Sequence, residues 1–220
     1  MKLKHLAIVA VLATAAPALA QSQSRARTNE FYISPIFTNS QSRTFEGGTT
    51  ARTDDGYGFG VGFARNFTPN LSAGIELAWS SAYYRTTLQP AVGNGSAALN
   101  SSGYIDTGSV RFVGTWNILS TPLTPFLTGG AGWTHVYTDL PSGPPQNSCW
   151  YYPWYGQVCS SYVPTQNTTK FAWNAGGGLR WDIGPYLVRG LVMAQKLDQG
   201  GAQGDHTWTQ WRLDFGMRFP

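Results

Sequence analysis

Large apolar side chains alternate with glycine along residues 57–67, Tyr-Gly-Phe-Gly-Val-Gly-Phe-Ala-Arg-Asn-Phe. Because successive side chains of a β-strand point to opposite faces, the aromatic and valine side chains would share one face and the three glycines the other. A strand in a soluble sheet usually hides its bulky face and shows polar groups to water. Here the glycine face carries no polar group before Asn66. The pattern predicts a wall with an apolar outside, in which Gly58, Gly60 and Gly62 leave interior room for arginine and glutamate side chains of other strands.

The same alternation recurs in seven further segments, which predicts eight strands in all. The predicted strands are residues 30–38, 57–67, 71–83, 104–118, 125–137, 169–183 and 186–196, and a last strand that follows the loop 198–206 and runs to Phe219. Their connections alternate between long and short, and the long ones cover 39–55, 85–102, 138–168 and 198–206. Bacterial outer-membrane barrels have an even number of strands, short periplasmic turns and long extracellular loops. The sequence therefore predicts an all-β fold, an eight-stranded antiparallel up-and-down transmembrane β-barrel.

The N-terminus is predicted to direct export. Within residues 1–20, two lysines precede an apolar run and an Ala-Leu-Ala triplet at 18–20 offers a cleavage site, as in a secretory signal peptide. Residues 21–28 are polar and are expected to form a disordered lead-in. This leaves 29–220 as a single outer-membrane barrel domain.

Net charge and composition limit the classes of partner and of membrane protein that the sequence allows. The formal net charge of +4 falls to +2 when Lys2 and Lys4 are removed with the signal peptide, so no binding to nucleic acid is expected. Only 12% of the residues are charged, and no apolar run after residue 20 is long enough for a transmembrane helix. A helical membrane protein is thereby excluded, whereas a membrane protein built of strands is not.

The chain resembles the eight-stranded outer-membrane β-barrel family, the group that contains the OmpA transmembrane domain, the OmpX-like proteins and the opacity-type adhesins. The likeness is carried by residues 57–63, 125–133 and 171–180, and by the closing alternation through Phe219. It implies a place in the bacterial outer membrane, contact with outer-membrane lipid, insertion by the barrel-assembly machinery, and salt-bridge networks inside the barrel. The chain departs from the family at its end, where Pro220 follows the usual terminal aromatic residue.

Seven charged residues fall on the predicted interior faces of the strands. They are Glu76, Arg111, Arg180, Asp182, Arg189, Arg212 and Asp214. Because the interior of an eight-stranded barrel is just wide enough for side chains to fill, these charges are expected to pair in an ionic network. The alternative that stays open is a gated, narrow pore.

The predicted loop 138–168 contains both cysteines, Cys149 and Cys159. Since the exported part of a chain meets an oxidising environment, a disulfide between them is expected. The segment that they enclose carries five large aromatic residues, Trp150, Tyr151, Tyr152, Trp154 and Tyr155. Aromatic side chains grouped on an exposed loop predict a surface recognition site. The alternative is that the rings fold against one another and the barrel rim as a plug.

No catalytic residue, metal site or cofactor is predicted. Only His135 and His206 remain after removal of the signal peptide, and His135 lacks the His-x-Ser spacing of barrel-type deacylases. Asp205 beside His206, near Thr207 and Thr209, is interpreted as a coincidence at a loop edge. Two histidines on different strands make a poor metal site, and the glycines of 57–67 lack the spacing of a phosphate-binding loop.

The predicted function is that of a monomeric outer-membrane barrel with a structural or surface-interaction role, adhesin-like, and a lumen filled by side chains. Its expected partners are outer-membrane lipid, the assembly machinery, and an extracellular ligand or host surface reached by the loops. A narrow porin-like diffusion channel is the first alternative. A soluble periplasmic lipid-binding barrel is the second.

Overall fold

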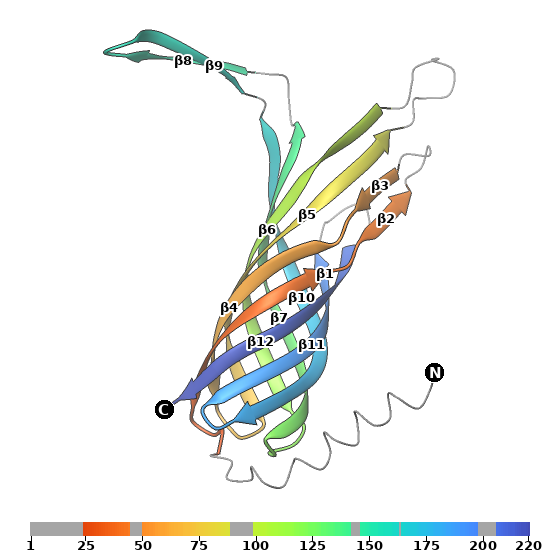
Figure 1. The fold of residues 1–220 in the computed structure, drawn as a ribbon, viewed down its shortest axis with the longest axis vertical. Helices are drawn as coiled ribbons and strands as arrows, with labels where there is room; N and C mark the ends of the chain where they lie inside the picture. The colour runs from red at the N-terminus through yellow and green to blue at the C-terminus, as the bar shows by residue number, and fades with distance from the viewer. Residues whose placement is uncertain (1–23, 45–49, 89–98, 142–145, 163, 198–205) are drawn as a thin grey trace.

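Eight long strands close into one antiparallel barrel in the computed structural model, which describes residues 24–44, 50–88, 99–141, 146–162, 164–197 and 206–220 (Figure 1). Each strand pairs with the next in the order β1-β4-β5-β6-β7-β10-β11-β12, and β12 pairs back with β1. The predicted fold class is therefore confirmed. Within the described residues, no helix has the length and hydropathy needed to cross a membrane. The barrel strands are β1 (Asn29–Thr38), β4 (Gly56–Asn66), β5 (Leu71–Leu88), β6 (Leu99–Asn117), β7 (Leu123–Pro141), β10 (Thr165–Ile183), β11 (Tyr186–Leu197) and β12 (His206–Phe219).

Four shorter strands lie in segments that were predicted to be loops. Strands β2 (Gln41–Thr44) and β3 (Thr50–Thr53) form a hairpin that extends the edge of β5, and β8 (Gln146–Tyr152) pairs with β9 (Gly156–Tyr162) as a separate two-stranded sheet. The loop prediction is wrong there because these strands bury no apolar face and so show no hydrophobic period. Threonine, tyrosine and tryptophan nevertheless favour the extended backbone, and pairing within a hairpin satisfies it.

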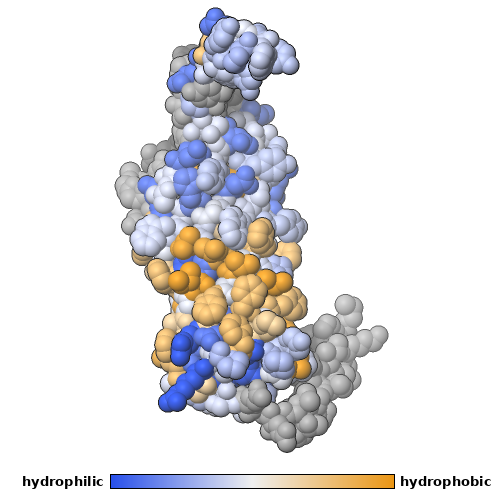
Figure 2. Space-filling view, turned by 90° about the vertical axis from the view of Figure 1, so that its left-hand side faces the viewer, coloured by the Kyte–Doolittle hydropathy of each residue, from blue (hydrophilic) through white to orange (hydrophobic). Residues whose placement is uncertain are grey.

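The barrel is apolar outside and polar inside. Figure 2 shows hydrophobic side chains gathered in a belt across the molecule, with hydrophilic surface on either side of it. Outward-facing residues such as Phe59 and Leu179 are about 60% exposed, while inward-facing Arg180 and Glu30 are fully buried. This arrangement inverts that of a soluble protein and matches the lipid-facing band of a transmembrane barrel.

The room beside Gly62 of β4 is filled by an aromatic ring and not by arginine or glutamate, which corrects the prediction for this glycine. A Cβ atom at Gly62 would lie 2.1 Å from Cζ of Tyr32, which comes from the neighbouring strand β1. A Cβ atom at Gly60 would lie 3.6 Å from Cδ1 of Ile36, which is on β1 like Tyr32. Glu76, which lies opposite Gly62 in the β4–β5 ladder, meets the hydroxyl of Tyr32 beside this ring.

The N-terminal segment packs against the short-turn end of the barrel. Residues 1–23, with the predicted signal peptide, lie outside the described residues. In the described part of the predicted lead-in, residues 24–28, Arg25 is 3% exposed. The backbone N–H of Arg27 also donates to the carbonyl oxygen of Asn66 at 2.8 Å, next to the end of β4.

Candidate functional site

Glu76 is the centre of an ionic cluster in the middle of the lumen. It lies opposite Arg111 in the β5–β6 ladder, and its carboxylate pairs with that guanidinium. From across the lumen, Arg212 of β12 donates through Nη1 to Oε1 at 2.8 Å and reaches Oε2 through Nη2 at 2.7 Å. The hydroxyl of Tyr32 donates to Oε2 at 3.3 Å. Since all four side chains are buried, these charge-assisted bonds replace the water that each charge gave up.

The cluster continues from β12 to β11 through Asp214. Its carboxylate accepts from Arg212 at 3.2 Å and from Arg189 at 2.9 Å. The Arg189 guanidinium carbon lies 4.2 Å from the centre of the Tyr32 ring, a distance that allows a cation–π interaction. Tyr32 thus touches the cluster at two points and links its ends.

A second ionic cluster lies nearer the short-turn end. Arg180 donates through Nη1 to Glu30 at 3.2 Å and through Nε to Asp182 at 2.9 Å. Asn66 donates to the other Glu30 oxygen at 2.7 Å. Each carboxylate therefore has a positive partner inside the barrel wall.

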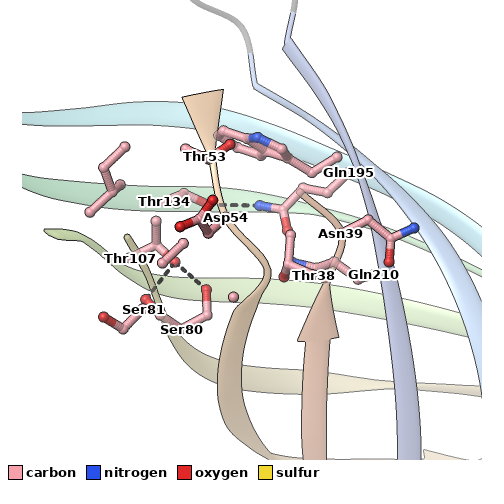
Figure 3. Close-up of a pocket in the computed structure, with 14 residues that line it drawn as sticks. Thr38, Asn39, Thr53, Asp54, Ser80, Ser81, Thr107, Thr134, Gln195 and Gln210 are labelled. Atoms are coloured by element: carbon pink, nitrogen blue, oxygen red, sulfur yellow. Dashed lines mark hydrogen bonds between the residues drawn. The ribbon is translucent and has the colours of Figure 1, made fainter. Parts of the chain in front are cut away.

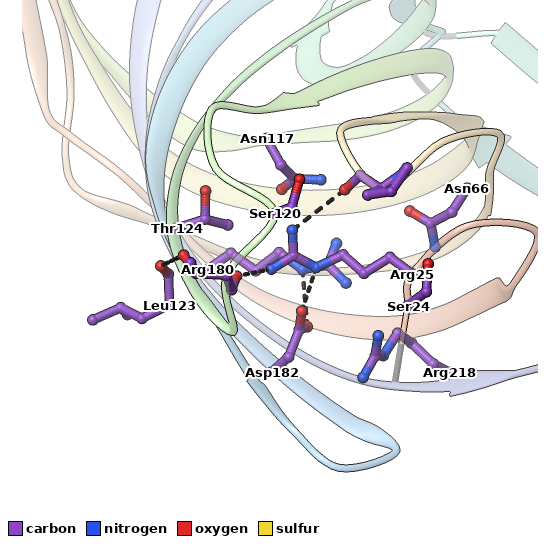
Figure 4. A network of polar contacts seen from close by, with 12 residues as sticks. Ser24, Arg25, Asn66, Asn117, Ser120, Leu123, Thr124, Arg180, Asp182 and Arg218 are labelled. Atoms are coloured by element: carbon purple, nitrogen blue, oxygen red, sulfur yellow. Dashed lines mark hydrogen bonds and ion pairs between the residues drawn. The ribbon is translucent and has the colours of Figure 1, made fainter. Parts of the chain in front are cut away.

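Arg25 closes this end of the barrel from outside the strands (Figure 4). Its guanidinium pairs with Asp182 and donates to backbone carbonyl oxygens of two short turns, at Leu119 (3.1 Å) and Pro69 (3.4 Å), and to that of Thr121. Burial lowers the pKa of the Arg25 guanidinium from its usual value, and the Asp182 carboxylate opposes that shift. One side chain of the N-terminal segment thereby links two of the short turns.

All seven residues of the predicted interior set are buried and joined by ion pairs, in two clusters rather than one continuous chain of contacts. Sequence reasoning missed Glu30, Tyr32 and Arg25. The first two lie on the interior face of β1 by simple alternation, so that signal was available. Arg25 lies before the first strand and has no periodic signal.

The clusters leave little free volume in the lumen. A void bounded by side chains that include Tyr32, Glu76 and Arg189 has a volume of about 10 Å³, which holds one water molecule at most. A solute could pass this level only if the buried ion pairs separated.

Above the clusters, a recess of about 60 Å³ opens at the long-loop end (Figure 3). Ser80 and Thr107 share a hydrogen bond of 2.7 Å on its wall, and Gln195 donates to Thr134 at 3.3 Å. Gln195 also accepts from Arg111 at 3.2 Å, which joins the recess to the ionic cluster below. Its size and lining suit a few water molecules, so water can enter from this end and meets the clusters.

The β8–β9 hairpin stands apart from the barrel at the long-loop end (Figure 1). Cys149 and Cys159 face each other in its ladder and form a disulfide. The five predicted aromatic side chains are exposed, at fractions of 44% for Trp150, 75% for Tyr151, 49% for Tyr152, 86% for Trp154 and 81% for Tyr155. They do not fold against the barrel rim, which is the arrangement that a plug would require.

The described residues contain no group of three or more His, Cys, Asp or Glu side chains placed to hold a metal ion. His135 faces outward from β7, where its Nδ1 and the Thr169 hydroxyl are 2.6 Å apart and its ring packs on Tyr137. It has no contact with either ionic cluster among the interactions described. The side chain of His206 and the whole of Asp205 lie outside the described part of the chain.

Comparison with known proteins gives likeness of fold alone. No family model matches the sequence, and no curated protein is significantly similar to it. Ail, the attachment invasion locus protein of Yersinia pestis, is 16% identical over 88% of this chain and 99% of its own, with a TM-score of 0.48. The outer membrane protein OprG of Pseudomonas aeruginosa is 14% identical over 88% of this chain and 96% of its own, with a TM-score of 0.48. Neisserial surface protein A is 12% identical over 86% and 95%, with a TM-score of 0.42. At identities and TM-scores this low, we draw no functional conclusion from these likenesses.

Proposed function

We propose that this chain is a monomeric outer-membrane barrel that displays the β8–β9 hairpin as a surface recognition element, in the manner of an adhesin. The observation that carries the proposal is the exposure of five tyrosine and tryptophan side chains on a hairpin closed by a disulfide. Tyrosine and tryptophan dominate the binding energy of many interfaces, and a disulfide reduces the entropy lost when a loop is fixed by a partner. The barrel then acts as a support that anchors the hairpin in lipid.

The outward apolar belt supports the membrane location. In a soluble periplasmic barrel, side chains such as Phe59, Phe112 and Leu179 would face water, and each is more than half exposed. In lipid the same exposure is favourable. The proposed partners are therefore outer-membrane lipid around the barrel and the assembly machinery that inserts it, with the extracellular ligand bound by the hairpin. The proposal includes no enzymatic activity and no cofactor.

A narrow porin-like channel is the second candidate. The recess of about 60 Å³ at the long-loop end favours it, because water can enter the barrel there. The buried ion pairs of Glu76 with Arg111 and Arg212 oppose it, since they cross the lumen below the recess. Breaking them for every passing solute would cost several kcal/mol.

Two measurements test the proposal. Replacing residues 146–162 by a glycine-serine linker of equal length should abolish the adhesion of cells that express the protein to a host surface. Heat-modifiable gel migration of the variant is the control that its barrel still folds. Adhesion that survives the replacement would refute the role of the hairpin. In planar bilayers the unaltered protein should give almost no steady current, and a steady ohmic conductance would favour the channel instead.

A further inference from the structure

We propose that the β8–β9 hairpin binds a neutral polysaccharide by stacking sugar rings on the face that carries Trp150 and Tyr152. This inference rests on the proposed role of the hairpin as the recognition element. It adds the chemical class of the ligand and the face that takes it. Four observations carry it: the division of the hairpin into two faces, the lack of charge, the polar groups beside the rings, and the lack of aliphatic side chains.

The hairpin ladder places two aromatic rings together on one face. Trp150 lies opposite Val158, and Tyr152 lies opposite Gly156, so both rings have small partners across the ladder. Because side chains two residues apart share a face, Trp150 and Tyr152 lie side by side along β8. The Tyr155 ring lies 6.3 Å from that of Tyr152 at 62°, which adds an edge to this surface.

The opposite face is different. It carries the disulfide, and the same alternation gives it Tyr151 opposite Gln157. A single tyrosine there offers no extended stacking surface. Of the two ladder faces, that of Trp150 and Tyr152 alone places two rings next to one another, so substitutions on the two faces are expected to differ in effect.

The hairpin and its flanks carry no charge. Between Asp139 and Lys170 the sequence contains no aspartate, glutamate, lysine or arginine. Sites for sulfate, phosphate or carboxylate groups depend on arginine and lysine for charge-assisted hydrogen bonds. A neutral ligand is the one that this segment complements.

Hydroxyl and amide groups accompany the rings on their own face. Ser148 lies opposite Ser160 in the ladder, two positions from Trp150, and Gln146 lies two positions further along the same face. Such side chains both donate and accept hydrogen bonds, as sugar hydroxyls do. The C–H groups on one side of a sugar ring are apolar with slight positive charge, and they suit the negative face of an aromatic ring.

The composition favours a sugar over a lipid surface. Residues 146–162 contain no Phe, Leu, Ile or Met, and Val158 is the one aliphatic side chain besides Pro153. Segments that bury themselves in a bilayer surface combine a large apolar face of Phe, Leu or Trp with lysine and arginine toward the headgroups. This hairpin has no lysine or arginine, and Trp150 and Tyr152 are flanked on their face by serine and glutamine where such a segment would have aliphatic side chains.

The test measures retention of the full-length protein, in detergent micelles, on immobilised polysaccharides. The polysaccharides are a neutral glucan, a neutral mannan, and the anionic polymers heparin and alginate. Binding to phosphatidylcholine vesicles is measured separately, with the protein in nanodiscs and no detergent. We expect binding to a neutral polymer that is insensitive to salt, because no charge pair is involved. Trp150→Ala and Tyr152→Ala should each weaken it about tenfold or more. The matched control Tyr151→Ala, on the opposite face, should change it less than about threefold.

Each other outcome overturns part of the inference. Binding only to heparin or alginate, lost as salt rises, would refute the neutral ligand, and ring-dependent binding to the vesicles would assign the hairpin to a lipid surface. An effect of Tyr151→Ala as large as that of Trp150→Ala would refute the choice of face. Gel mobility without reductant and heat-modifiable migration check that every variant keeps its disulfide and barrel. If cell adhesion depends on the hairpin but no neutral polymer binds, this inference fails and the proposed function stands. If adhesion does not depend on the hairpin, the proposed function fails.

Discussion

Replacing Glu76 with glutamine is expected to destabilise the barrel by about 3–5 kcal/mol, the cost of removing one partner from a buried ion pair. The Glu76 side chain is 2% exposed and pairs with both Arg111 and Arg212. Glutamine keeps the size of the side chain but removes its charge, so two guanidinium groups lose a shared counter-charge in the protein interior. At about 1.4 kcal/mol per factor of ten, the ratio of folded to unfolded protein would fall by roughly 10²–10⁴.

The assay is equilibrium unfolding in urea of the barrel inserted in phospholipid vesicles, followed by tryptophan fluorescence. Asp54→Asn is the matched control, because Asp54 pairs with Arg85 at 2.9 Å while its side chain is 31% exposed. Pairs exposed to water contribute about 0–1 kcal/mol. Adding Arg111→Gln to Glu76→Gln removes the guanidinium that has no other carboxylate partner among the described ion pairs, and should recover part of the loss. Equal effects of Glu76→Gln and Asp54→Asn would refute the stabilising role of the central cluster.

Three further changes test other parts of the structure. Gly62→Ala should cost about 1–3 kcal/mol in the same assay, because its Cβ would lie 2.1 Å from the Tyr32 ring. Gly190→Ala, with no atom within 4 Å of its Cβ, should be nearly neutral, and the reverse order would contradict the packing. Arg25→Ala should cost about 1–3 kcal/mol, because Asp182 loses one of its two guanidinium partners and the turn carbonyls lose their donor. An unchanged unfolding midpoint would show that the contacts of the N-terminal segment do not stabilise the barrel. Cys149→Ser should alter gel mobility without reductant but leave barrel unfolding unchanged, since the hairpin is a separate sheet; unaltered mobility would contradict the disulfide.

The barrel could be predicted from the sequence because lipid and lumen impose opposite demands on alternate residues. In β12, for example, Trp211, Leu213 and Phe215 face outward while Arg212 and Asp214 face inward. The sequence of each strand therefore shows which of its faces points to lipid and which to the lumen, without information from the neighbouring strands. The same alternation identifies interior charges one strand at a time, which is how Glu76 and Arg111 could both be assigned to the interior before any register was known.

What the sequence could not predict depends on contacts outside this alternation. Arg25 belongs to no strand, and its contacts come from turns that are far away along the chain. The β8–β9 hairpin buries no face, so no hydrophobic period marks it, and its pairing follows from the turn before Gly156, where φ is +75°. Charged side chains were predicted beside Gly62 because a glycine in the sequence indicates free space but does not identify the neighbouring side chain that fills it. Only the register of β1 against β4 brings Tyr32 to that position.

The length of the strands that flank the hairpin bears on how it can act. Strands β7 and β10 contain 19 residues each, whereas about 9–11 tilted residues cross the bilayer. About eight residues of each strand, roughly 25 Å of paired ribbon, therefore continue beyond the apolar layer. The two strands stay paired there, as at Asn167 opposite Tyr137, so the extension is stiffer than two single chains. A hairpin rich in tryptophan and tyrosine that lay close to the bilayer would settle into the interface, where such rings are favoured. Because β7 and β10 stay paired as far as Pro141 opposite Thr165, the chain enters the hairpin segment well outside the apolar layer, where a ligand can reach the rings.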